Sequence, residues 1–317
     1  MNFDEVTKDI FELSSLEQRC HILSRSVPDI SLQSKEFIKN CNLKDRLELA
    51  SRFIEIDILD TARSDFDILS KYGWFPWVEI SNELSDSLSL ILMGMNKPAL
   101  DCQRRALELA GVAGYLSLDT TPKDKVKNWI SSKEDTPSFT YSITEFSKSG
   151  YPSKVESISS WVKPVKKYYW ELCNSVHTKG ESYSGRKINN YAGSFNGIAI
   201  HRFDEANLYV SCEKFISTVE MIAMITALMN PISLFGLPID EKFGMNPPIS
   251  GFLNDFQSDR LKCILPEQFR EILISIATKD EGCISIIEWI NSLPDLSDDD
   301  LQAQNNEISK LYDKPNS

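Results

Sequence analysis

The stretch KPALDCQRRALELAGVAGYLSL, residues 97–118, decides the fold class that the sequence predicts. Small or apolar residues recur in it at intervals of four, three, four and three, which places on one face of an α-helix Cys102, Ala106, Leu109, Ala113 and Leu116. Pro98 suits the first turn of such a helix, where its missing N–H removes no hydrogen bond. Because most residues of this face are small, we expect a neighbouring helix to approach it closely.

Two adjacent arginines lie on the same predicted helix. At about 100° per residue, Arg104 points nearly opposite the small-residue face, whereas Arg105 lies beside it. An arginine at the edge of a packed face needs an acidic or carbonyl partner, or it extends into solvent. Glu108 follows Arg105 by three residues, so the spacing predicts an ion pair between them.

A second helix is predicted for KPVKKYYWELCNSVHTKG, residues 163–180, with Gly180 suited to its end. Its core-facing stripe consists of Val165, Tyr169, Leu172 and Val176. Trp170, Asn174 and His177 fall together on a different face, about 120–180° away. His177 lies in the last turn, where the helix dipole favours a protonated imidazole. Two interpretations are open: a capping histidine near Trp170, or a histidine displayed for acid–base chemistry or phosphate contact.

Length and composition predict a large all-helical protein. The chain has 317 residues, 42% hydrophobic and 25% charged, which excludes wholesale disorder. Its 13 glycines and 14 prolines are few for this length, and this favours long helices over many strands and turns. We predict an all-α fold: a central antiparallel helical bundle over 73–235, an N-terminal helical region over 1–72 and a C-terminal helical region with an acidic tail over 236–317.

The order of helices follows from punctuation by Gly, Pro and polar residues. A helix ending near Gly94 should form an antiparallel hairpin with the stretch that begins at Lys97. The polar stretch 119–151 contains one predicted short helix, and 181–196 reads as a loop that either covers His177 as a lid or only connects two helices. Further helices are expected before and after these segments, at 29–38, 43–69, 203–229, 266–278, 282–290 and from Asp298 onward.

The charge of the chain is unevenly distributed. A formal net charge of −12 makes a poor general nucleic-acid binder, because affinity for phosphate comes largely from Lys and Arg. Residues 163–187 nevertheless hold six basic residues against two acidic ones, and 280–313 hold nine acidic residues against one basic. The first run would hold a phosphate, and the second would mask it or bind a basic partner. Solvated helix faces explain both runs equally well.

The cysteines and the apolar runs predict a cytoplasmic location. The seven cysteines are scattered singly, which is typical of reduced thiols. The chain begins with the acidic MNFDE, unlike a signal peptide. The most apolar run, 221–229, is too short to span a bilayer and predicts a buried helix, so no membrane association is expected.

No motif for a metal, nucleotide or hydrolase site is present. The histidines, His21, His177 and His201, lack nearby ligands at zinc-site spacing. A Walker loop, a Gly-x-Gly-x-x-Gly turn and a Gly-x-Ser-x-Gly elbow are all missing from the sequence. We therefore predict no cofactor, no metal and no nucleotide site of these kinds.

Two short segments carry a resemblance to a known family. RRALELA at 104–110 and LCNSVHTKG at 172–180 resemble the HEPN-like group of bacterial all-helical proteins, over about residues 75–230. The resemblance implies a component of toxin–antitoxin or abortive-infection systems, in which many members are metal-independent endoribonucleases and dimers. It implies that His177 orients or deprotonates a ribose hydroxyl, while Arg105 or Lys179 stabilises phosphorane charge.

The chain departs from the catalytic pattern of that family, which places an arginine shortly before a histidine. The residues five to seven positions before each histidine contain no arginine. We therefore predict an interaction or regulatory protein with a degenerate catalytic motif, which binds a protein partner or a second copy. The alternatives are an endoribonuclease acting on RNA, with His177 and Arg105 as catalytic residues, and a helical adaptor that uses its acidic C-terminal region. The predicted binding residues are Glu108, Trp170, Asn174 and Lys179.

Overall fold

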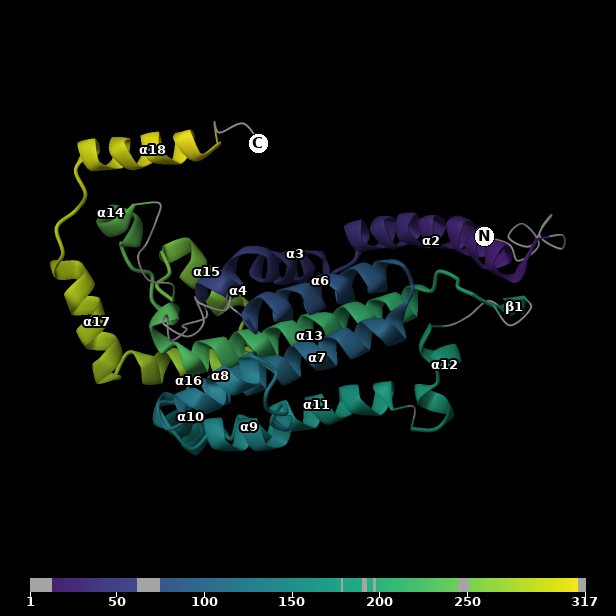
Figure 1. Cartoon of the computed structure of the whole chain (residues 1–317), viewed down its shortest axis with the longest axis horizontal. Coiled ribbons are helices and arrows are strands. Elements are labelled where there is room, and N and C mark those ends of the chain that lie inside the picture. The colour runs from purple at the N-terminus through teal and green to yellow at the C-terminus, as the bar shows by residue number, and fades with distance from the viewer. Residues whose placement is uncertain are drawn as a thin grey trace.

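The computed structural model describes residues 13–61, 75–177, 179–189, 193–195, 198–244 and 251–312. In these residues the chain is all-α, as predicted, apart from one two-stranded antiparallel hairpin. Figure 1 shows long helices lying side by side along the longest axis, with shorter helices at one end. None of the described helices is both long and apolar enough to cross a membrane.

The elements follow one another along the chain without long gaps. They are α2 (Ser15–Asn40), α3 (Lys44–Arg52), the π-helical η1 (Phe53–Asp57), α4 (Ile58–Thr61), α6 (Trp77–Leu92), α7 (Asn96–Leu116), α8 (Lys123–Ile130), α9 (Phe139–Phe146), α10 (Gly150–Ser159), α11 (Val162–Val176), the 3-10 turn η3 (Glu181–Tyr183), α12 (Gly185–Asn189), β1 (Gly193–Phe195), β2 (Ile198–Ile200), α13 (Glu205–Met229), the 3-10 turn η4 (Pro231–Leu234), α14 (Ile239–Phe243), α15 (Asp255–Ile264), α16 (Glu267–Ala277), α17 (Glu281–Ser292) and α18 (Asp298–Tyr312).

Helix α7 lies at the centre of the long helices. It packs against α6, α9, α11 and α13, and most of its residues are buried. The predicted hairpin with α6 is antiparallel: Glu83 near the middle of α6 pairs with Arg105, and Ser87, one turn later, donates to the carbonyl of Ala99 at 3.1 Å. The helix predicted from 97–118 is therefore the one around which the core forms.

The small-residue face of α7 receives aromatic side chains of α9. A Cβ atom on Gly111 would lie 2.8 Å from the Phe139 ring, and one on Gly114 would lie 3.1 Å from Phe146. Phe139 in turn stacks on Tyr169 of α11, with ring centroids 4.1 Å apart. The close approach that the small residues predicted is thus made by α9, because glycine leaves room for a ring directly against the helix backbone.

The prediction of a single short helix in 119–151 is wrong. Besides α8, this stretch contains α9 and the start of α10. The Ser138 hydroxyl caps α9 by accepting from the N–H of Tyr141, and Phe139, Ile143 and Phe146 are buried at intervals of four and three. The many polar residues around this short apolar pattern hide it from a reading of the sequence.

The N-terminal helix and the segment after α11 also differ from their predictions. Helix α2 begins at the Ser14 capping box and continues through Pro28, so no helix starts near Asp29. Ile22 and Ile30 are buried on either side of Pro28, and this packing keeps the helix continuous where proline removes one hydrogen bond. In the described part of 181–196, the predicted loop is replaced by η3, α12 and β1. The expected continuation of a helix from 62 to 69 lies outside the described residues.

A buried polar network crosses the core between four long helices. Gln103 of α7 donates to the Ser87 hydroxyl of α6 at 3.0 Å and accepts from Thr218 of α13 at 3.2 Å. The Tyr168 hydroxyl of α11 lies 2.9 Å from Thr218 and donates to the carbonyl of Lys214 at 2.5 Å. A fully paired network in an apolar core favours one register of the helices, because any shift would leave buried groups without partners.

One continuous hydrophobic core extends from Leu43 to Ala277. A smaller cluster beneath the C-terminal helices contains Ile232, Leu237, Ile239, Cys283 and Ile290. The two ends of the chain are also joined by a buried ion pair: Asp57 of η1, which is fully buried, accepts from Arg260 of α15 at 2.6 and 2.8 Å. The region boundaries near residues 72 and 235 stay predictions.

Candidate functional site

Helices α7 and α11, which carry the predicted site residues, lie side by side, as the sequence predicted. Val165, Tyr169 and Leu172 of α11 are buried against the core. Trp170 and Asn174 lie on the outer face, and the Trp170 side chain is 55% exposed. The helical periodicity of 163–176 therefore separated the core face from the outer face correctly.

The predicted ion pair between Arg105 and Glu108 is wrong. Arg105 donates to both carboxylate oxygens of Glu83 on α6, at 2.6 and 2.7 Å, and also binds Asp101. The hydrogen bond with Glu83, followed by the Asp101 charge, raises the pKa of Arg105 above its already high usual value, although burial opposes the rise. Glu108 instead accepts from Arg104 at 2.7 Å. The i,i+4 spacing of Arg104 and Glu108 is satisfied, while Arg105 is turned toward the neighbouring helix.

Arg104 lies toward α11 rather than free in solvent. Its guanidinium pairs with Glu108 and Asp101, and it interacts with the Tyr169 side chain of α11. Burial lowers the pKa of Arg104, but Glu108 and Tyr169 more than offset this, so the pKa is raised. Burial also raises the pKa of Tyr169. This cluster is a packed, charge-balanced contact between two helices, and it holds α11 in register on α7.

His177 and Lys179 lie at the exposed end of α11. His177 caps the helix through its backbone N–H, which donates to the Cys173 carbonyl at 2.9 Å, and its side chain is exposed. Lys179 is also exposed. Within the described residues no hydrogen bond or ion pair joins Arg105 to His177, because Arg105 is held by Glu83 on α6. The structure therefore places the two predicted catalytic residues in different surroundings.

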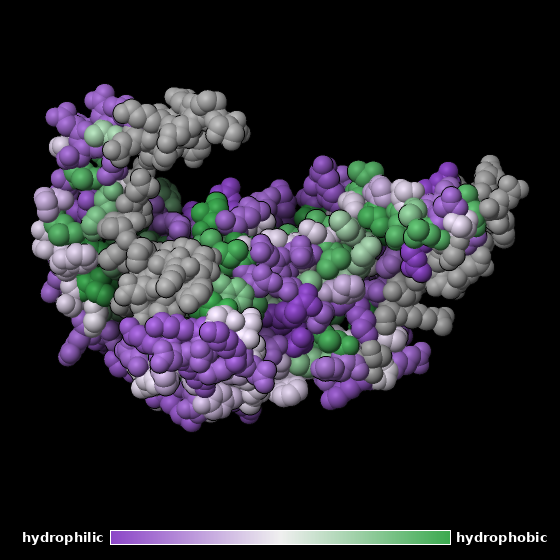
Figure 2. Space-filling view, viewed as in Figure 1, coloured by the Kyte–Doolittle hydropathy of each residue, from purple (hydrophilic) through white to green (hydrophobic). Residues whose placement is uncertain are grey.

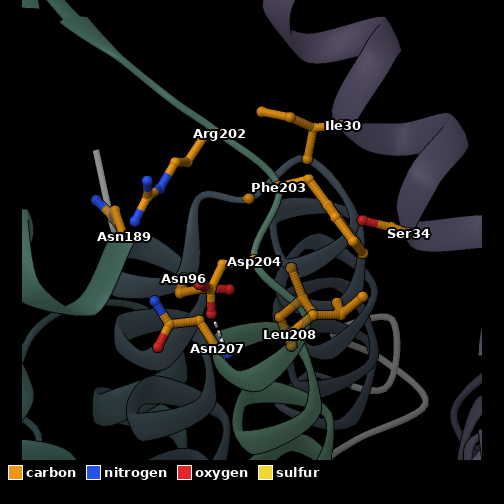
Figure 3. Close-up of a pocket in the computed structure, with 11 residues that line it drawn as sticks. Ile30, Ser34, Asn96, Asn189, Arg202, Phe203, Asp204, Asn207 and Leu208 are labelled. Atoms are coloured by element: carbon orange, nitrogen blue, oxygen red, sulfur yellow. Dashed lines mark hydrogen bonds between the residues drawn. The ribbon is translucent and has the colours of Figure 1, made fainter. Parts of the chain in front are cut away.

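A small polar pocket lies where α2, the start of α7, α12 and the start of α13 meet (Figure 3). Asn189 accepts from the N–H of Lys97 at 2.8 Å, and the Asn96 amide donates to the Ile188 carbonyl at 3.3 Å. The cavity measures about 10 Å³, which is about the volume needed for one water molecule. The Asn96 Oδ1 atom is buried and has no partner among the described residues, so a water donating to it would complete this junction.

A larger groove lies between α2, α3 and α6, with a volume of about 550 Å³. Its apolar lining comes from all three helices and consists of Ile38, Leu47, Leu88, Leu92 and Met93. Lysines at its edges make it basic within a chain of net charge −12; they are Lys35, Lys39 and Lys44, against one carboxylate, Glu48. Figure 2 shows hydrophobic surface next to hydrophilic surface over the face where α2 and α3 lie. We call this site the lysine-rimmed groove.

Two of the rim lysines are available to a ligand. Lys39 pairs with Glu36 at 3.1 Å, one turn away on α2. In the part of the chain that the structure describes, no hydrogen bond or ion pair engages the ammonium group of Lys35 or Lys44. The sequence signal for this site was weak, because its charges are spread over two helices and its apolar residues over three.

No group of three or more His, Cys, Asp or Glu side chains in the described ranges could hold a metal ion. All seven cysteines are free thiols. Burial raises the pKa of Cys102 and of Cys283 to about 11, which makes both thiols weak nucleophiles at neutral pH. Comparison with protein-family models, curated proteins and solved structures finds no match to this chain.

Proposed function

We propose that this chain is a helical interaction protein of the cytoplasm, related in role to the regulatory HEPN-like proteins that it resembles and without their catalysis. One observation carries the proposal: the lysine-rimmed groove offers an open apolar surface with basic edges. Its volume of about 550 Å³ lies in the range of ligand-binding clefts, and three helices form its walls. An apolar helix face with acidic edges suits such a groove.

The same reasoning weighs against the endoribonuclease alternative. In a nuclease of this kind, an arginine beside the histidine would stabilise negative charge on the phosphorane. Arg105 already neutralises Glu83 and Asp101, so its charge is committed to carboxylates of the fold. His177 is exposed at a helix end, far less enclosed than a site that excludes water.

A photo-cross-linking residue placed at Ser89, an exposed residue of the groove, tests the proposal in cells. We expect a discrete protein adduct that disappears when Leu92 in the apolar lining is changed to Glu. The same cross-linker at exposed Lys133, which lies after α8, is the control. Identical adducts from both positions, or an adduct indifferent to Leu92→Glu, would contradict the proposal.

A direct assay separates this function from the nuclease. The pure protein is incubated with total RNA without metal, beside the His177→Ala variant. We expect negligible cleavage by both chains. Cleavage by the wild type that His177→Ala abolishes would show that the chain is an enzyme and would overturn the proposal.

A further inference from the structure

Helix α18 lacks an extensive packing surface within its own chain. Over Asp298–Asn306, where its side chains are described, only Leu301 and Gln304 are partly buried. Gln304 donates to the carbonyl of Phe243 at 3.3 Å, and its side chain lies against Gly244. Helices of this length, 15 residues, are marginal in water unless one face packs against another element. A surface that covers α18 is therefore expected to stabilise it.

The lysine-rimmed groove matches α18 in chemistry. The first turn of α18 presents three exposed carboxylates, Asp298, Asp299 and Asp300, followed by Leu301. The groove offers an apolar lining beside Lys35 and Lys44, whose ammonium groups have no acidic partner in the described chain. Docking would bring opposite charges together at the rim and move apolar surface out of water.

The position of α18 favours the groove of another copy over its own. Just before the helix, Asp295 pairs with Lys242 at 2.6 Å, and the N–H of Leu296 donates to the Glu241 carbonyl at 2.8 Å. These contacts hold the start of α18 beside α14, at the end of the molecule away from α2 (Figure 1). Reaching the groove of its own chain would require breaking them, whereas a second copy brings its groove without that cost.

We infer that α18 of one copy docks in the lysine-rimmed groove of a second copy, so that reciprocal docking forms a two-fold symmetric dimer. This inference rests on the proposed function, because it names the partner of the same groove. Each dimer contains the contact twice, since a two-fold axis pairs the α18 of each chain with the groove of the other. The acidic first turn lies along the lysine rim, and Leu301 faces the apolar lining.

Charge reversal and its rescue test the dimer by sedimentation equilibrium with full-length chains. The groove variant is Lys35→Glu/Lys44→Glu, and the helix variant is Asp298→Lys/Asp299→Lys. Asp300 is left unchanged because its carboxylate accepts from Ser297 and caps the helix. We expect a dimeric wild type and a dissociation constant at least about tenfold higher in either variant, because like charges then face each other.

The chain carrying all four substitutions should regain most of the wild-type affinity, because the charges are again opposite. A matched control, Lys133→Glu/Lys163→Glu, changes the net charge equally at exposed lysines outside the groove and should leave the dimer unchanged. Far-UV circular dichroism checks that each variant is folded.

Three results would overturn the inference: a monomeric wild type, a dimer that neither charge reversal weakens, or a fourfold variant that is no tighter than its parents. The proposed function fails separately. If the chain is monomeric but Ser89 still cross-links a different protein through Leu92, the groove is an interaction site for that protein and only the dimer is excluded.

Discussion

Helices α7 and α18 are both amphipathic in sequence, yet they occupy opposite environments. Helix α7 is enclosed by four other helices, and its buried Gln103 is paired on both sides. In the described half of α18, most side chains are exposed. The difference teaches that a helix in this protein owes its stability to what encloses it, because local propensity alone leaves a 15-residue helix marginal. The first helix organises the fold, and the second is available for binding.

The sharpest way to break this comparison is to remove one buried charge and one exposed charge. Asp57 is fully buried and paired with Arg260, so Asp57→Ala should lower the free energy of unfolding by about 3–5 kcal/mol, because the guanidinium loses its partner. Asp295→Ala, at the exposed pair with Lys242 beside α18, should lower it by about 0–1 kcal/mol. Urea titrations measure both. Equal losses would refute the contrast between interior and edge.

Adding one methyl group to the centre of α7 is the next largest effect. Gly111→Ala places a Cβ 2.8 Å from the Phe139 ring, which is stacked on Tyr169 and has little room to move. We expect a loss of about 1–3 kcal/mol despite the better helix propensity of alanine. Gly114→Ala meets Phe146 at 3.1 Å and should cost less. A more stable Gly111→Ala variant in thermal unfolding would show that α9 does not hold α7 closely.

A smaller effect is expected from pH at the edge of the core. Burial lowers the pKa of His201, between β2 and α13, although a backbone contact with Gly94 opposes the shift. The folded state then binds this proton less readily than the unfolded state, so stability should fall as pH drops through about 6.5, the unfolded value. His201→Gln should remove part of the difference in urea midpoint between pH 7.5 and 5.5. An unchanged difference would assign it to other groups.

The smallest expected effect is the loss of α18 itself. Ending the chain at Ser297 should change the free energy of unfolding of the monomer by less than about 0.5 kcal/mol, because few side chains of α18 pack on the body. The measurement requires a protein concentration at which the chain is monomeric. Amide hydrogens of α18 should also exchange much faster than those of α7. A large loss of monomer stability would show that α18 belongs to the core.

Periodicity predicted the long helices well and the positions of charged side chains poorly. The helical repeats in 97–118 and 203–229 appear as α7 and α13, and the acidic signal at Asp298 starts α18. The partner of Arg105 was wrong because Glu83 lies 22 residues away on α6, and no local spacing indicates it. The lysine-rimmed groove was missed for the same reason: its lining comes from three helices.

The sequence by itself determined that this protein is all-α, because the spacing of apolar and small residues specifies which side of each helix avoids water. Only the tertiary structure decided which neighbour each side meets. Arg104 and Arg105 are consecutive, and a rotation of about 100° along the helix turns one toward α11 and the other toward α6. Neighbours that are distant in sequence therefore set the ion pairs, the groove and the surface left for binding.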